Sequence, residues 1–168
     1  MISRLEKTLY RLEAQHACLK WAFDQIADKP GVIFEIGLGH GRTFSHMRHH
    51  LKDREIYAFD REKDKAYPDC RPEPEYMILG EVAETLPKAV ERFKGQVVLG
   101  HSDIGSFDRT KNREKSEMIS LALPPAIAPG GLVMSDLPLE MPGFERLPLP
   151  EGAREDRYYI YQIGRAHV

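Results

Sequence analysis

The sequence predicts an α/β fold: a doubly wound, seven-stranded, mostly parallel sheet with an antiparallel last strand, helices on both faces and an extra N-terminal helix. Three observations lead to this prediction. Short apolar runs alternate with stretches of helical periodicity, which is typical of βα units. A glycine-rich turn follows the first apolar run, at residues 37–41. Two short β-rich runs close the chain, as expected for an antiparallel end of the sheet.

The first predicted element is a helix over residues 3–28. Ser3 and Glu6 form a capping-box pattern in front of Leu5, Leu9, Leu12, Leu19, Phe23 and Ile26, which recur at helical spacing. Further helices are expected at 43–51, before Gly95 and at 118–128. The segments 61–75 and 106–115 are expected to be loops, because the first contains three prolines and the second is densely charged. Strands are expected at 32–36, 55–60, 76–79, 96–103, 132–136, 144–147 and 158–163.

Composition and charge narrow the class of protein. The 168 residues predict one domain over 1–168, with residues 1–30 as an N-terminal helix and 31–168 as the core. The net charge of −2 gives no broad attraction to nucleic acid or to an anionic membrane, so neither is an expected partner. Without a signal peptide or an apolar run of ~18 residues, a cytoplasmic location is expected. The long amphipathic first helix is compatible with a homodimer.

Residues 32–43 combine a strand, a tight turn and the start of a helix. Glycines at 37, 39 and 41 let a ligand approach the backbone, and the N–H groups of the helix that Thr43 opens face the same place. This geometry is a nucleotide-sized cradle. The dinucleotide fingerprint also needs a glycine at its sixth position, where this chain has Arg42. An NAD-binding oxidoreductase is therefore an alternative, and not the first interpretation.

An acid follows the second predicted strand at the distance that a nucleotide site needs. Asp60 lies 19 residues after Gly41, close to the ~20 residues between a nucleotide-binding turn and a ribose-binding acid. A carboxylate at the carboxyl end of the neighbouring strand can accept hydrogen bonds from both ribose hydroxyls. The glycine turn and this acid together are the strongest functional signal in the chain.

The pattern Glu35-x-Gly37-x-Gly39-x-Gly41, followed by Asp60, resembles the first motifs of class I, Rossmann-like S-adenosylmethionine-dependent methyltransferases. The resemblance extends from Val32 to Ile163 and is that of a small, bacterial-type, single-domain member. It implies S-adenosyl-L-methionine as the cofactor and S-adenosyl-L-homocysteine as the product, with Glu35 near the methionine end and Glu81 and Val82 at the adenine edge. The cofactor-binding residues that it implies are Glu35, Gly37, Leu38, Gly39, Gly41, Arg42, Thr43, Asp60, Arg61, Glu81, Val82 and His101.

Polar residues at the end of the fourth predicted strand are the expected catalytic group. In the family this position faces both cofactor and acceptor, so His101 and Asp103 are the candidates for a general base in an in-line methyl transfer. Asp103 and Asp136 also resemble the acids of the metal-dependent branch typified by catechol O-methyltransferase. That branch has Asn after its second acid, where this chain has Leu137, so no divalent metal is expected.

The acceptor is the least determined feature. The Asn-Pro-Pro-Tyr type of signature, found where bases and amides are methylated, is absent after the fourth strand, which favours a small-molecule acceptor. Residues 1–28, 104–116 and 137–152 would select that molecule, and they carry no readable motif. A non-catalytic S-adenosylmethionine-binding protein is the second alternative.

Overall fold

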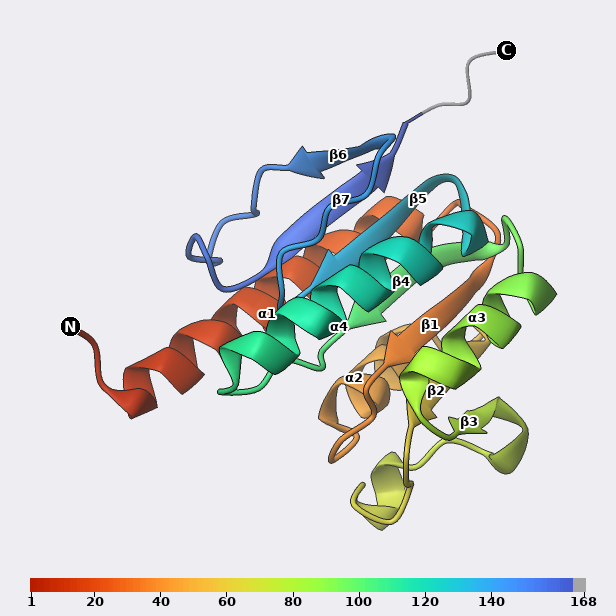
Figure 1. Cartoon of the computed structure of the whole chain (residues 1–168), viewed down its shortest axis with the longest axis horizontal. Coiled ribbons are helices and arrows are strands. Elements are labelled where there is room, and N and C mark those ends of the chain that lie inside the picture. The colour runs from red at the N-terminus through yellow and green to blue at the C-terminus, as the bar shows by residue number, and fades with distance from the viewer. Residues whose placement is uncertain (165–168) are drawn as a thin grey trace.

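A seven-stranded sheet forms the centre of the computed structural model, which describes residues 1–164 (Figure 1). Residues 165–168 of the predicted core lie outside the described residues. The strands are β1 (Val32–Ile36), β2 (Ile56–Asp60), β3 (Met77–Leu79), β4 (Val97–Ser102), β5 (Ile127–Ser135), β6 (Phe144–Leu147) and β7 (Tyr159–Ile163).

The strand order β3-β2-β1-β4-β5-β7-β6 confirms the predicted fold class. Strands β1 to β5 pair in parallel, and β7 runs antiparallel between β5 and β6. The order reverses between β1 and β4, and a reversal of this kind opens a crevice at the carboxyl ends of the strands. The functional residues predicted from the sequence follow these same strand ends.

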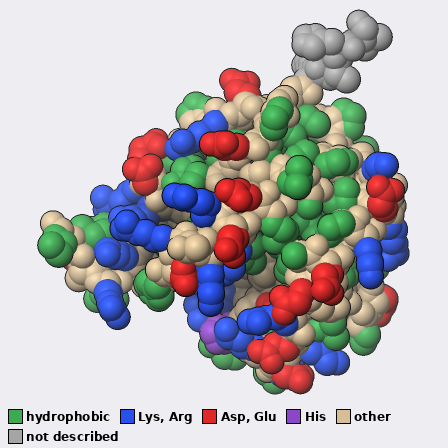
Figure 2. Space-filling view, in the orientation of Figure 1, with side chains coloured by type: hydrophobic (Ala, Val, Ile, Leu, Met, Phe, Trp, Pro, Cys, Tyr) green, Lys and Arg blue, Asp and Glu red, His purple; other side chains and the backbone are tan. Residues whose placement is uncertain are grey.

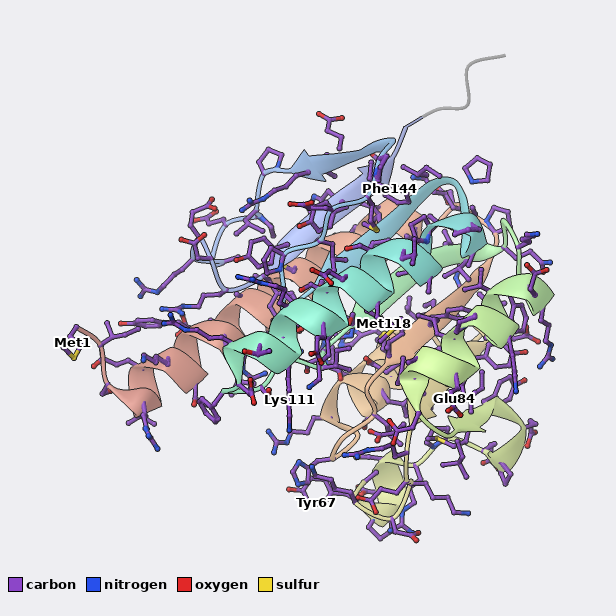
Figure 3. All side chains as sticks on the ribbon, viewed as in Figure 1. Met1, Tyr67, Glu84, Lys111, Met118 and Phe144 are labelled. Atoms are coloured by element: carbon purple, nitrogen blue, oxygen red, sulfur yellow. The ribbon has the colours of Figure 1, made fainter. Side chains whose placement is uncertain are left out.

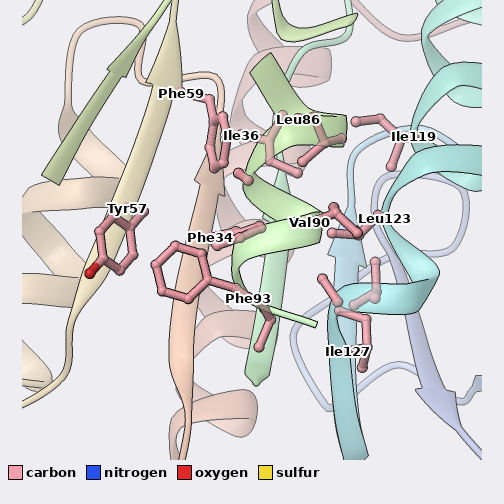
Figure 4. Packing of buried hydrophobic residues seen from close by; sticks show 14 of the residues in the cluster. Phe34, Ile36, Tyr57, Phe59, Leu86, Val90, Phe93, Ile119, Leu123 and Ile127 are labelled. Atoms are coloured by element: carbon pink, nitrogen blue, oxygen red, sulfur yellow. The ribbon is translucent and has the colours of Figure 1, made fainter. Parts of the chain in front are cut away.

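Helices cover both faces of the sheet. Helices α1 (Arg4–Ile26) and α2 (Arg42–His50) pack on one face, and α3 (Val82–Arg92) and α4 (Arg109–Ala122) pack on the other (Figure 1). Figure 4 shows the second face, where apolar side chains of α3 and α4 lie over β1, β2 and β5. No helix within residues 1–164 is long and apolar enough to cross a membrane.

Helix α1 is anchored at one end only. The predicted capping box is present: the Ser3 hydroxyl accepts from the Glu6 backbone N–H at 3.1 Å, and the Glu6 carboxylate accepts from the Ser3 N–H. The second half of the helix is buried against the sheet, while the first half projects, with Met1 at its tip (Figure 3). Leu5 and Leu9 are therefore 79% and 47% exposed, so the predicted long helix forms but only its second half is buried.

The predicted boundaries around α4 are also wrong. Helix α4 begins at Arg109, inside the expected loop 106–115, because the Asp108 carboxylate accepts from the Lys111 N–H at 3.1 Å and caps the helix. The charged residues of that segment are the solvent face of the helix. Two prolines after Leu123 form the short 3₁₀ helix η3 (Pro124–Ala126), so α4 ends at Ala122 instead of residue 128.

Strand β5 consequently begins earlier than predicted. Residues 129–131 lie between the predicted helix and the predicted strand. In the structure they belong to β5, at a point where its pairing with β4 shifts register. Gly131 allows this close approach, because a Cβ there would lie 2.8 Å from the Ala128 carbonyl oxygen. Glycine and proline inside a strand often mark such an irregularity.

The segment between β2 and β3 covers the glycine turn. It contains two short 3₁₀ helices, η1 (Pro68–Cys70) and η2 (Pro74–Tyr76), and no α-helix, as its prolines predict. The Tyr67 N–H donates to the His40 carbonyl at 3.0 Å, and a Cβ on Gly41 would lie 2.6 Å from the Cys70 carbonyl oxygen. Figure 3 shows Tyr67 on this segment. The glycine turn is thus fixed by contacts with this segment as well as by the sheet.

Candidate functional site

The glycine turn lies at the carboxyl end of β1 and leaves open space over one of its residues. Gly37 has φ +96°, and a Cβ there would lie 2.7 Å from Ile104 Cγ2 and 2.9 Å from the Asp103 carbonyl oxygen. Gly39 also has a positive φ, +54°, but no atom lies within 4 Å of a Cβ built on it. Gly37 is therefore needed for close packing against the segment after β4, whereas Gly39 borders the cradle.

Asp60 is fixed against this turn. Its Oδ2 accepts from the Gly39 N–H at 2.9 Å, and its Oδ1 accepts from the Arg61 N–H at 2.7 Å. Arg61 lies 3.8 Å from the carboxylate of Glu81, and both side chains are exposed. The structure thus brings Asp60, Arg61 and Glu81 together beside the turn, as the sequence predicts.

The remaining candidates for cofactor binding differ in how far their side chains are buried. Leu38 is buried in the core that α1 and α2 cover, and its backbone N–H and carbonyl already bond to the Phe59 carbonyl and the Gly41 N–H. Arg42 is exposed and Thr43 half-buried at the start of α2, with Thr43 next to Glu35. Val82 is half-buried and packs against the core under α3.

Glu35 and His101 form an ion pair inside the core. The two residues are direct partners in the pairing of β1 with β4, and their side chains point to the face that α1 and α2 cover. Both are 0% exposed, and His101 Nδ1 lies 2.7 Å from Glu35 Oε1. Burial opposes the charge on the imidazole, but the Glu35 carboxylate outweighs it and raises the pKa of His101 to about 9. Burial also raises the pKa of the Glu35 carboxyl, against the opposing effect of the His101 charge.

Further hydrogen bonds extend this pair towards the carboxyl end of β4. His101 Nε2 lies 3.2 Å from the hydroxyl of Tyr158, the residue before β7. The Gln15 amide of α1 donates to the same hydroxyl and, at 2.9 Å, to Asp103 Oδ2. Both ring nitrogens of His101 are thus occupied within the core, and the chain of contacts ends at Asp103. Of the two predicted general bases, only Asp103 is exposed enough to meet an acceptor.

Neither Gln15 nor Tyr158 is predicted from the sequence. Gln15 offered one signal, because it is a polar residue between Ala14 and Cys18 on the buried side of an amphipathic helix. Tyr158 offered none, since a tyrosine that opens a terminal strand usually packs in the core. Both residues were missed because their role depends on contacts between distant parts of the chain.

A cavity of about 400 Å³ opens beside Asp103, at the carboxyl ends of β4 and β5. Helix α1 forms one wall, the segments after β4 and β5 form the floor, and the residues before β7 close one side. The lining residues are Lys7, Thr8, Arg11, Asp103, Gly105, Ser106, Phe107, Asn112, Asp136, Leu137, Asp156 and Arg157.

Two carboxyl groups share the floor of this cavity. Asp136 Oδ2 accepts from the Gly105 N–H at 2.9 Å, and Arg11 lies 3.9 Å from Asp103 Oδ1. Burial and then the negative charge of Asp103 raise the pKa of Asp136 to about 7. Among residues 1–164 no group of three or more His, Cys, Asp or Glu is arranged to hold a metal ion. That no divalent metal takes part stays a prediction.

The raised pKa of Asp136 predicts how stability depends on pH. Between its ordinary value of 3.8 and about 7, the folded protein binds more protons than the unfolded chain, so this carboxyl makes stability fall as pH rises through that window. We expect the stability of Asp136→Asn relative to wild type to be greater at pH 8 than at pH 4. The increase in this relative stability should be on the order of 3 kcal/mol. Urea unfolding at the two pH values measures this.

The control for this experiment is Asp156→Asn, which removes the same charge at an exposed position of the same cavity. It is expected to follow the wild-type pH dependence. An Asp136→Asn protein that keeps the wild-type pH dependence would show that this carboxyl is ionised normally in the fold.

The fold and the site together define a class of protein. A parallel sheet whose order reverses between β1 and β4, an antiparallel β7, and a glycine turn next to Asp60 are the features of a class I, Rossmann-like methyltransferase. The chain belongs to the family described as S-adenosyl-L-methionine methyltransferase (Methyltransf_17), which matches residues 2–163. It is therefore an S-adenosylmethionine-dependent methyltransferase, and the NAD-binding and non-catalytic alternatives have no support.

Solved structures agree with this assignment. An S-adenosyl-L-methionine methyltransferase from Silicibacter pomeroyi DSS-3 is 41% identical, with a TM-score of 0.93 over 98% of this chain and 100% of that chain. A putative caffeoyl-CoA O-methyltransferase from Staphylococcus aureus is 14% identical, with a TM-score of 0.56 over 98% and 85% of the two chains. The antibiotic-resistance methyltransferase Kmr is 13% identical, with a TM-score of 0.54 over 87% and 91%. The last two show the fold alone. A search of curated proteins finds no match.

Proposed function

We propose that the whole chain acts as one methyltransferase domain, which transfers a methyl group from S-adenosylmethionine to a small molecule bound in the 400 Å³ cavity. One observation carries the proposal. Asp103 belongs to both places: its carbonyl oxygen touches the glycine turn beside Gly37, and its carboxylate lines the cavity. The cofactor cradle and the acceptor cavity therefore lie on two sides of the same residue, Asp103.

The cradle fits S-adenosylmethionine. Asp60 keeps lone pairs for ribose hydroxyls beyond the two N–H groups that it already accepts. The open space over Gly39 admits a ligand against the backbone, and Glu81 with Val82 would meet the adenine edge. Glu35 contributes to this site through its position under the turn, because its charge is already paired with His101.

The chain's own residues supply orientation and a proton acceptor. S-adenosylmethionine, when bound, would supply a methyl group that its sulfonium makes electrophilic. Asp103 would take the proton that the acceptor's oxygen or nitrogen loses as that atom is methylated. Gln15 and Arg11 fix that carboxylate on two sides. Holding two reactants in line can supply roughly 7–11 kcal/mol, so no covalent nucleophile is needed.

His101 is a positioning residue in this mechanism. It does not reach the cavity, but it fixes Tyr158, which with Asp103 is the partner of the Gln15 amide. The orientation of the Asp103 carboxylate thus depends on the buried Glu35–His101 pair, which is connected to it through Tyr158 and Gln15.

The proposal is tested first at the cofactor site. We expect calorimetric titration to show S-adenosylhomocysteine binding to the wild type, and Asp60→Ala to weaken it by about 1–3 kcal/mol, the cost of unpaired polar groups. Asp64→Ala, an exposed acid on the same segment, serves as the matched control and is expected to bind normally. Absence of wild-type binding would refute the cofactor site. Equal binding by Asp60→Ala would remove Asp60 from it.

A further inference from the structure

The acceptor cavity contains two buried polar atoms that lack a partner among residues 1–164. They are Asp136 Oδ1 and Arg157 Nε, and both residues line the cavity. Arg157 Nε donates a hydrogen bond, and Asp136 Oδ1 accepts one when this carboxyl is ionised. Leaving a buried polar atom without a partner is costly, so native structures leave few of them unpaired. A ligand that offers both a donor and an acceptor would pair both atoms.

Three cations and three acids line the cavity, and one of the acids, Asp156, is next to Arg157. Lys7 and Arg11 of α1 and Arg157 before β7 provide positive charge at the outer wall, and Figure 2 shows basic side chains around the end of the molecule where α1 projects. Asp103 and Asp136 provide the acidic floor at the strand ends. Arg11 already lies near Asp103, so Arg157 and Lys7 are the cations that remain for a ligand.

The chemistry of these groups defines the ligand. A guanidinium is planar and matches a carboxylate better than it matches a neutral amide. A carboxylate floor accepts from a hydroxyl or amine and can take its proton. The volume of about 400 Å³ lies near the lower end of ligand pockets, so the molecule is small.

We infer that the methyl acceptor is a small hydroxy acid or amino acid: its carboxylate binds Arg157 and Lys7, and its hydroxyl or amine, the group to be methylated, donates to the Asp103–Asp136 floor. This inference rests on the proposed function, because it treats the cavity as the acceptor site. It adds the chemical class of the acceptor and makes Arg157 a specificity-determining residue.

The test compares acids with neutral amides of the same shape. The probes are 3-hydroxybutyrate and 4-hydroxybenzoate, each beside its amide, added to protein saturated with S-adenosylhomocysteine. Binding is followed by NMR of the arginine Nε–H groups and by calorimetry. We expect at least one acid to shift the Arg157 Nε–H signal and to bind at least about tenfold more tightly than its amide, the scale of one charge-assisted hydrogen bond.

Two variants assign that difference to a residue. Arg157→Gln is expected to abolish the preference for the acid. Arg154→Gln is the matched control and should keep it, because Arg154 lies over the Tyr10 ring, 3.7 Å from its centroid, and does not line the cavity.

Each outcome separates this inference from the proposed function. If S-adenosylhomocysteine binds but neither acid is preferred over its amide, the acceptor class is wrong and the methyltransferase proposal stands. If the acid preference survives in Arg157→Gln, Arg157 does not determine specificity. If the wild type does not bind S-adenosylhomocysteine, the cofactor site fails, whatever the acids do.

Discussion

Replacing His101 with leucine is expected to lower the free energy of unfolding by about 3–5 kcal/mol, the usual cost of removing one partner from a buried ion pair. The substitution leaves Glu35 fully buried beside an apolar side chain, and it also removes one of the two partners of the Tyr158 hydroxyl. The double variant Glu35→Leu/His101→Leu is expected to lose less than the two single variants together, because no charge then stays buried. Urea unfolding at pH 7 measures all three.

The pH dependence of the wild type gives a second measure of this pair. The pKa of His101 is raised to about 9, so the stability that its protonation contributes is present below its ordinary pKa of 6.5 and is lost as pH rises through 9. His101→Leu is expected to lack this loss. His49→Leu, on the exposed side of α2, is the control and should unfold like the wild type. Additive losses in the double variant would show that Glu35 and His101 are not coupled.

The second large effect is expected at Gly39. Replacement with alanine should weaken S-adenosylhomocysteine binding at least about tenfold, because the new methyl group would enter the space that the cofactor needs. Gly95→Ala is the matched control: Gly95 has φ +65° against +54° for Gly39, and each has open space where a Cβ would lie. Both substitutions should cost about 1–2 kcal/mol of stability through backbone strain alone.

Calorimetry and urea unfolding of the two glycine variants distinguish the effect of backbone strain from that of a methyl group that occupies the cofactor's space. Weak cofactor binding in Gly39→Ala, with normal binding in Gly95→Ala at equal stability, would place the cofactor over Gly39. Normal binding in both variants would show that the open space at the turn is not part of the cofactor site.

The cofactor side of the site could be predicted from the sequence because its determinants are local. The glycine triplet needs only its own backbone and the start of α2, and Asp60 follows at a distance that one βα unit fixes. The seven strands and the antiparallel last strand were predicted for the same reason, since each element carries its own periodicity. Helix α4 was misplaced because a charged solvent face and a charged loop have the same composition, and only the capping by Asp108 distinguishes them.

The acceptor side could not be predicted in the same way. His101 was singled out for its position at a strand end, but the sequence could not show that Glu35 would occupy one ring nitrogen and Tyr158 the other. Gln15 and Arg157 enter the site from elements at opposite ends of the chain. The homodimer and the cytoplasmic location stay predictions.

The hydrogen bonds that end at Asp103 also bear on the order in which the protein becomes active during synthesis. Gln15 and Tyr158 are separated by 143 residues along the chain, so their contact cannot form until residue 158 has been synthesised. The residues assigned to the cofactor cradle all lie before residue 104. Contacts of such long range slow folding because the chain entropy is lost before they form. The contacts that orient Asp103 would therefore be completed only after every segment of the cofactor cradle has been synthesised, and methyl transfer would become possible last.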